Sequence, residues 1–236
     1  RSGGLELKII FLGTGGSLPT KDRGLASIAI RRKGEVLLFD CAEGTQRQMA
    51  NTEISPMKVD SIFLTHFHGD HFLGIPGLVQ TMSLMDRERK LVIFGPKGTG
   101  EKITSLLEIP VYNLKFDIEV VDLEPGDVID REGYRIETSA VDHSTPGLAY
   151  ALVEDERPGK FYLEKAKELG IEPGPKYSRL QDGESIELSD GTKVRPSQVM
   201  GPSRPGRKVV YSGDTRPTDE IINLAEGADV LIHDGT

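Results

Sequence analysis

Cysteine is almost absent from this chain of 236 residues, and so are long apolar runs and an excess of positive charge. The single cysteine, Cys41, excludes an intrachain disulfide and a metal site built from thiolates. It follows the apolar run "EVLLFD", which favours a buried structural thiol over a nucleophile. No apolar run approaches the roughly 20 residues that span a bilayer, and the N-terminus lacks the layout of a signal peptide. We therefore expect a cytoplasmic protein without a membrane partner.

The charge balance narrows the classes of partner. Acidic residues outnumber basic ones by 37 to 29, so the net charge is −8. Proteins that wrap nucleic acid without sequence preference are usually basic, because neutralising phosphates drives that binding. The balance argues against an extended nucleic-acid surface, and no DNA partner is expected. It leaves room for a local basic patch.

Short apolar runs bounded by glycine and proline recur along the chain, and their β-branched content predicts strands. The runs cover residues 7–13, 35–40, 61–66, 91–96, 117–123, 134–141, 147–154, 208–214 and 229–234. Helices are predicted at 72–86, 98–108, 160–169 and 217–227. Many strands with a few interspersed helices indicate a layered α/β sandwich. "RSGG" at 1–4 reads as a cloning remnant, which leaves 5–236 as one domain.

One segment differs in character from the rest. Residues 154–188, "EDERPGKFYLEKAKELGIEPGPKYSRLQDGESIEL", are rich in charge, proline and glycine and poor in the β-branched residues of the strands around them. The segment reads as an arm inserted between core strands. Composition alone also fits a surface loop with one solvated helix.

The stretch "LTHFHGDHFLG", residues 64–74, holds three of the five histidines. His66, His68, Asp70 and His71 follow an apolar strand, and Gly69 permits a tight turn among them. Such a turn can direct His66 and His68 to one ion and Asp70 and His71 to a second. Imidazoles and a carboxylate suit zinc, and manganese or iron less selectively. The alternative of packing or surface histidines would gather titratable rings with no metal to organise them.

Four residues on one turn cannot complete two coordination shells, so further ligands are expected elsewhere. His143 in "SAVDHSTPG" and Asp214 in "VVYSGDTRP" both follow β-like runs. An aspartate at a strand end can bridge two cations that lie about 3.5–4 Å apart. Taken alone, His143 fits a hydrogen-bonded loop histidine equally well, and Asp214 fits a cap of the next helix.

The order "THFHGDH", "DHSTPG" and "YSGDT" resembles the metallo-β-lactamase superfamily. "FLGTGGSLPTKDRGLAS", "FDCAEGTQRQM", "FGPKG" and "LGIEPGPKYSRLQDGESI" are similar to the ribonuclease Z family within it, and together they cover most of the chain. The resemblance implies an αβ/βα sandwich with metals at one edge of the two sheets and a protruding exosite arm. It also implies a zinc-dependent endoribonuclease that removes the 3′ trailer from precursor tRNA, leaving a 3′-hydroxyl on the tRNA and a 5′-phosphate on the trailer.

The resemblance also implies roles for particular residues. His66, His68 and His143 would hold one zinc, Asp70 and His71 the other, and Asp214 would bridge them. Asp70 would also handle the proton of the attacking water. The arm would grip tRNA through a set of cations and a stiff tip: Lys160, Lys165, Lys167, Gly174, Pro175, Lys176 and Arg179. The family typically forms homodimers.

A loop near the N-terminus matches the family in part. Pro19, Lys21 and Arg23 in "PTKDRG" correspond to a loop that senses the tRNA 3′ end, but Gly24 stands where the family has asparagine. Discrimination against CCA-ended tRNA is therefore left open.

The resemblance breaks near the C-terminus, where two further family histidines have no counterpart. We therefore expect that a C-terminal part is missing, that the second zinc site is incomplete in this chain, and that this form has little activity. His233 is read as a structural residue. Two other functions stay open: a different two-metal phosphodiesterase of the superfamily, and a non-catalytic RNA-binding protein stabilised by metal.

Overall fold

The computed structural model describes residues 7–111 and 113–235. Two compact units divide the chain: unit 1 comprises 1–129, 136–151 and 209–236, and unit 2 comprises 130–135 and 152–208. Among the described residues, no helix is long and apolar enough to cross a membrane.

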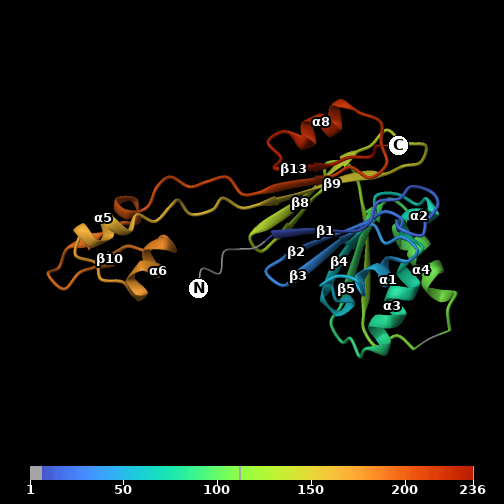
Figure 1. The fold of residues 1–236 in the computed structure, drawn as a ribbon, viewed down its shortest axis with the longest axis horizontal. Helices are drawn as coiled ribbons and strands as arrows, with labels where there is room; N and C mark the ends of the chain where they lie inside the picture. The colour runs from blue at the N-terminus through green and yellow to red at the C-terminus, as the bar shows by residue number, and fades with distance from the viewer. Residues whose placement is uncertain (1–6, 112, 236) are drawn as a thin grey trace. The chain divides into compact units, whose positions relative to one another are not determined.

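A six-stranded sheet forms the first layer of unit 1 (Figure 1). Its strands, in spatial order, are β1 (Leu7–Gly13), β2 (Ser27–Arg32), β3 (Glu35–Phe39), β4 (Val59–Phe63), β5 (Leu91–Pro96) and β6 (Ile118–Leu123). β1, β2 and β3 pair antiparallel, whereas β3 to β6 pair parallel. Lys33 and Gly34 both have positive φ, as a two-residue hairpin between β2 and β3 requires. The parallel strands end at one edge, where the polar motifs begin.

A five-stranded sheet contains, in spatial order, β13 (Val230–Ile232), β12 (Lys208–Tyr211), β9 (Leu148–Glu154), β8 (Tyr134–Ala140) and β7 (Val128–Arg131). Aromatic rings from both sheets meet between them. Phe39, Phe63 and Phe94 stack across β3, β4 and β5 with ring centroids about 5 Å apart, and Tyr150 of β9 lies 5.5 Å from Phe63. Because side chains alternate along a strand, the neighbouring residues Leu38, Ile62 and Ile93 join a separate core on the other face.

Helices cover the outer faces of unit 1, as Figure 1 shows for α3 and α4 on one sheet and α8 on the other. The helices are α1 (Thr45–Met49), a 3-10 turn η1 (Pro56–Lys58), α2 (Gly69–Phe72), α3 (Ile75–Leu84), α4 (Thr99–Glu108) and α8 (Asp219–Ala225). The layers are therefore helix, sheet, sheet and helix, which confirms the expected αβ/βα sandwich.

The helix predicted at 72–86 is confirmed as α3 (Ile75–Leu84), but it starts later than predicted, because Phe72 ends the separate turn α2 and Gly74 lies between the two helices. A Cβ at Gly74 would lie 2.0 Å from the Ala42 carbonyl oxygen. The chain therefore needs glycine there, and α3 begins only at Ile75. Strands β2 and β7 and helix α1 were not predicted from the sequence.

Unit 2 has its own small core. It contains α5 (Leu163–Glu168), α6 (Pro175–Gln181), α7 (Pro196–Val199) and the short hairpin of β10 (Ile186–Glu187) and β11 (Lys193–Val194). The buried side chains of this core are Ala166, Ile171, Leu180, Ile186, Val194 and Val199. A surface loop with one solvated helix has no such core. Pro175 opens α6, so the sequence "EPGPKY", predicted as a stiff tip, leads into a helix.

Candidate metal centre

The histidine motif lies directly after β4, at the end of the parallel strands. The Leu64 amide still donates to the Phe94 carbonyl, so the chain leaves the sheet only at Thr65. His66 and His71 are buried, whereas His68 is exposed and precedes the single turn of α2. The turn thus places two buried imidazoles and one exposed imidazole at the same edge of the sheet.

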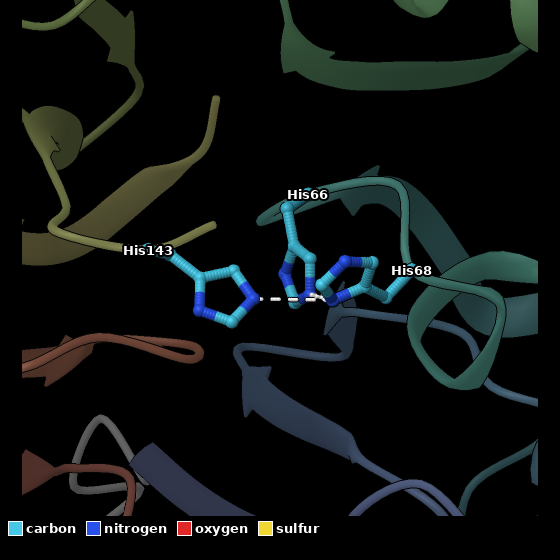
Figure 2. Close-up of side chains that lie close together, drawn as sticks. All are labelled: His66, His68 and His143. Atoms are coloured by element: carbon cyan, nitrogen blue, oxygen red, sulfur yellow. Dashed lines mark hydrogen bonds between the residues drawn. The ribbon is translucent and has the colours of Figure 1, made fainter. Parts of the chain in front are cut away.

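Three imidazoles converge from two loops (Figure 2). His66 Nε2 and His143 Nε2 each lie 3.1 Å from His68 Nδ1. One ring nitrogen carries only one proton or one lone pair, so His68 Nδ1 cannot satisfy both neighbours. A shared cation would satisfy all three nitrogens. These three residues, predicted as ligands of one ion, therefore form a donor set that fits a divalent metal.

A second group comprises His66, His71 and Asp214, whose ligand atoms also lie within 4.8 Å of one another. His71 Nε2 lies 3.4 Å from Asp214 Oδ1 and 3.8 Å from Asp70 Oδ2. Asp70 Oδ2 accepts a hydrogen bond of 2.7 Å from the Ser17 amide. The structure thus brings all six predicted ligands together, with Asp70 beside this second group and His66 in both groups.

The loops that carry His143 and Asp214 are tied to each other. The Arg216 amide donates to the Asp142 carbonyl and the Asp142 amide donates to the Thr215 hydroxyl, both at 3.0 Å. Gly213 has a φ of +59°, and a Cβ there would lie 2.7 Å from the Thr65 side chain. These contacts place a residue from each loop beside the histidine motif, although the two loops lie far apart in the sequence.

Asp40 is a functional residue that the sequence analysis missed. Its buried carboxylate accepts hydrogen bonds from the Thr65 amide, the Thr65 hydroxyl and the Tyr211 hydroxyl, and from His71 Nδ1 at 2.8 Å. The Thr65 hydroxyl in turn lies 3.0 Å from His66 Nδ1. These partners leave the Nε2 atoms of His66 and His71 facing the metal-ligating groups. The available signal was an acid directly after the apolar strand "EVLLF", which ends at the same sheet edge.

The two buried histidines have pKa values shifted in opposite directions. Burial, followed by the positive charge of His71, lowers the pKa of His66 to about 4. Burial also opposes a charged His71 ring, but the negative charges of Asp40 and Asp214 outweigh it and raise the pKa of His71 to about 10. The hydrogen bond from His71 lowers the pKa of Asp214. In the metal-free protein at neutral pH, His66 is neutral and His71 is charged.

A hollow of about 660 Å³ opens over these groups, and we call it the metal pocket. Its lining includes His68, Asp70, His143 and Asp214, together with a second set from the surrounding loops: Ser17, Leu18, Pro19, Leu25, Glu43, Gly69 and Leu73. Pro19 therefore faces the pocket, whereas Lys21 and Arg23 are exposed and do not line it. The metal pocket therefore offers carboxylates and imidazoles beside a rim that carries exposed apolar side chains.

The remaining candidate residues lie outside this centre. The seven arm residues belong to unit 2, and all are exposed. Lys167 pairs with Glu164, Arg179 pairs with Glu184, and the Lys165 ammonium lies 4.7 Å from the centre of the Tyr162 ring. His233 is half-buried, and its Nδ1 lies 2.6 Å from the Asp234 carbonyl. Cys41 is fully buried, as expected of a structural thiol.

Comparison with known proteins connects this geometry to a family. A family model described as anti-Pycsar protein Apyc1 matches residues 7–157, which include the histidine motif but not Asp214. A ribonuclease Z from Methanosarcina acetivorans is 52% identical over 230 residues, covering 98% of this chain and 75% of that protein.

Solved structures point the same way. The short form of human tRNase Z is 25% identical with a TM-score of 0.68, over 97% of this chain and 78% of that one. A metallo-β-lactamase fold protein from Bacillus subtilis, YhfI, shares the fold at 17% identity and a TM-score of 0.62, over 95% and 69% of the two chains. The chain therefore belongs to the ribonuclease Z family and has the metallo-β-lactamase fold.

Proposed function

We propose that this protein is a metal-dependent endoribonuclease that removes the 3′ trailer from precursor tRNA and leaves a 3′-hydroxyl on the tRNA and a 5′-phosphate on the trailer. One observation carries the proposal: six candidate ligands lie together, four of them lining the metal pocket, in a chain 52% identical to a ribonuclease Z. The fold alone would not select this reaction, because one fold hosts many chemistries.

The residues of the site divide the chemical work. Zinc ions, when bound, would acidify a water and offset the negative charge that builds on the phosphodiester. Asp70 is held through Oδ2 by the Ser17 amide, which leaves Oδ1 to accept the proton of the attacking water. Asp40 holds the His71 ring by Nδ1, so that ring cannot rotate away during the reaction. Leu18 and Leu73 add exposed apolar surface at the rim of the metal pocket, beside these polar groups.

We propose two zinc ions, with manganese or iron as substitutes. The support is the donor chemistry, since imidazoles and carboxylates without thiolates suit these metals. The two candidate groups share His66, which supports a pair of neighbouring ions. Asp214, which lies 3.4 Å from His71 Nε2, is proposed to bridge them, as the family resemblance implies.

We further propose that unit 2 binds the tRNA body and that the protein acts as a homodimer in the cytoplasm. The exposed cations of unit 2 include Lys160 and Lys176, and such cations position RNA through its phosphates without reading sequence. Contacts confined to unit 2 and the rim of the metal pocket are compatible with the acidic net charge. Pro19, Lys21 and Arg23 are proposed to contact the tRNA 3′ end.

The test is cleavage of a 3′-extended precursor tRNA by the full-length protein, with the cut mapped at nucleotide resolution. We expect one cut at the start of the trailer, lost with chelator and lost in Asp70→Ala. Reversing the charge of Lys160, Lys165, Lys176 and Arg179 together should reduce precursor cleavage but not hydrolysis of bis(p-nitrophenyl) phosphate. Lys58→Glu, an exposed change in unit 1, is the matched control.

A different two-metal phosphodiesterase is the second candidate, because the two ligand groups specify metals rather than a substrate. That reading requires efficient hydrolysis of a small diester and no mapped cut in precursor tRNA. Tight precursor binding with neither activity would instead establish a non-catalytic RNA-binding protein.

A further inference from the structure

A second hollow of about 440 Å³ lies between α1 and α3 in unit 1, and we call it the α1–α3 pocket. Gln46, Arg47 and Ala50 line it from α1 and its C-terminal end, and Leu73 and Gly77 line it from the α3 side. None of these five residues ligates metal in either group described above. The chemistry proposed for the metal centre therefore leaves this pocket without a role.

The α1–α3 pocket adjoins the metal pocket. Glu43 and Leu73 line both hollows, so these two side chains form the boundary between them. Leu73 is half exposed, which makes it an apolar ridge rather than a wall. A flexible chain whose phosphodiester lies in the metal pocket can therefore continue over Leu73 into the α1–α3 pocket.

Local sequence keeps this pocket open. A Cβ at Gly77 would lie 3.3 Å from Gln46 Oε1, so a larger residue would begin to fill the hollow. Gln46 Nε2 donates to the Thr81 hydroxyl. That bond fixes the orientation of the amide and turns Oε1 toward Gly77, as an acceptor on the floor of the pocket.

Apart from the exposed Glu43 carboxylate at the boundary with the metal pocket, the lining offers three kinds of contact. Leu73 supplies apolar surface, Gln46 Oε1 supplies a hydrogen-bond acceptor, and Arg47 supplies an exposed cation. A nucleotide presents the three complementary features: a flat base, donor groups on the base edge, and an anionic phosphate. The volume also falls within the range of about 300–1,000 Å³ that is common for small-ligand sites.

We propose that the α1–α3 pocket binds one nucleotide of the RNA, immediately beside the cleaved phosphodiester. Its base contacts Leu73 and the Gln46 amide, and its phosphate contacts Arg47. This inference rests on the proposed function, because it assumes an RNA substrate in the metal pocket. It assigns to the pocket a part in choosing where the chain is cut, distinct from the binding of the tRNA body.

The test uses the full-length, metal-loaded protein and two variants. Ala50→Trp fills the pocket from an exposed helix end, and Arg47→Ala removes the cation. Asn51→Trp is the matched control for bulk, because Asn51 is exposed and does not line the pocket, and Lys58→Ala is the control for charge. Each kcat/KM on precursor tRNA is divided by the rate on bis(p-nitrophenyl) phosphate, which reports the state of the metal centre.

We expect both variants to lower this ratio by about tenfold or more, the size of one lost base or phosphate contact, and both controls to leave it unchanged. The defect of Ala50→Trp should disappear on a precursor that is abasic at one nucleotide next to the cut. The defect of Arg47→Ala should disappear on a precursor with a neutral methylphosphonate at that same nucleotide.

An unchanged ratio, or an equal loss on every modified precursor, would overturn the assignment of the pocket while leaving the proposed function intact. Absence of precursor cleavage by the unmodified protein would overturn both. The abasic position that rescues Ala50→Trp identifies which side of the cut the pocket holds.

Discussion

Asp40 contacts both halves of the metal centre without being one of its ligands. It holds His71 directly, and it reaches His66 through the Thr65 hydroxyl. The carboxylate is fully buried, and the Tyr211 hydroxyl also donates to it. One side chain therefore orients two imidazoles. A change in the charge of Asp40 should alter the hydrogen bonding of both His66 and His71.

We expect Asp40→Asn to lower metal affinity by about 10–100-fold, the usual cost of losing a partner that orients a ligand. The amide keeps the size of the side chain but replaces one acceptor oxygen with a donor that faces donors. Competition with a chelating dye measures the affinity. Asp60→Asn is the matched control, since Asp60 lies on β4 and pairs with Arg89; equal losses in both variants would show that Asp40 has no special role.

Metal binding should release a proton at one group of ligands only. The pKa of His71 is raised to about 10, so its ring is charged at neutral pH and must lose a proton to ligate, whereas the pKa of His66, lowered to about 4, leaves that ring neutral. In the folded metal-free protein, His71 keeps this proton below about pH 10. The metal ion competes with the proton for the ring, so metal binds more tightly as pH rises. We expect about one proton released near pH 8.

Calorimetry in buffers of different ionisation enthalpy counts that proton. The apparent affinity should rise by up to about tenfold per pH unit between roughly pH 6 and 9. In Asp40→Asn the negative charge beside His71 is gone, so the count should fall. A count of zero in the unchanged protein at pH 8 would contradict the charged state of His71.

Among the secondary-structure elements, the join between α3 and β5 depends on one buried cation. Arg87 is almost fully buried, and its guanidinium donates to the carbonyls of Arg89, Lys90 and Met57 while lying 5.3 Å from the Phe116 ring. The side chain thereby satisfies backbone acceptors that no strand or helix reaches. It fixes the start of β5, one of the strands that end at the metal centre.

Arg87→Ala should lower the free energy of unfolding by about 2–4 kcal/mol, because the Arg89 and Lys90 carbonyls lose a donor, the Met57 carbonyl keeps only its bond from Arg89, and a cavity forms. Urea denaturation measures the change. Lys90→Ala removes an exposed ion pair with Glu119 in the same segment and should cost less than about 1 kcal/mol. Similar values for the two variants would refute the capping role of Arg87.

The sequence predicts those strands whose residues form a continuous apolar, β-branched run. The runs at β4, β5 and β9 are apolar and β-branched, and the structure confirms strands there. Helix α1 has five residues, too few to show a helical period. The break at Gly74 depends on the Ala42 carbonyl, a neighbour about thirty positions away in the chain, and no local signal announces such a contact.

In the metal centre, too, the ligands that share a short motif are predictable from sequence, whereas contacts between residues remote in sequence are not. The spacing in "THFHGDH" marks metal ligands, and the resemblance adds His143 and Asp214, which the structure brings to the same place. Asp40 carries no motif of its own, because its role depends on burial and on Tyr211, which is remote in sequence. The hydrogen bond to Asp70 is likewise invisible in the sequence. Its donor is the amide of Ser17, a residue whose φ of +53° is set by the folded loop.

At the scale of the whole molecule, the metal centre and the core of unit 2 are separate. All six predicted metal ligands belong to unit 1, whereas Leu180 packs in the small core of unit 2 described above. Two compact units with independent cores can lose order independently. Damage to the core of unit 2 should therefore separate recognition of the tRNA body from the chemistry of the metals.

Leu180→Ala should destabilise unit 2 by about 2–5 kcal/mol, the usual cost of truncating a buried leucine. Faster hydrogen exchange confined to 152–208 would show the local effect. We expect a large loss of precursor cleavage but unchanged metal content and unchanged hydrolysis of bis(p-nitrophenyl) phosphate. Leu163→Ala, at an exposed position of the same unit, is the matched control and should behave like the unmodified protein. If small-diester hydrolysis falls as far as precursor cleavage, the two units do not act separately, and unit 2 supports the metal centre itself.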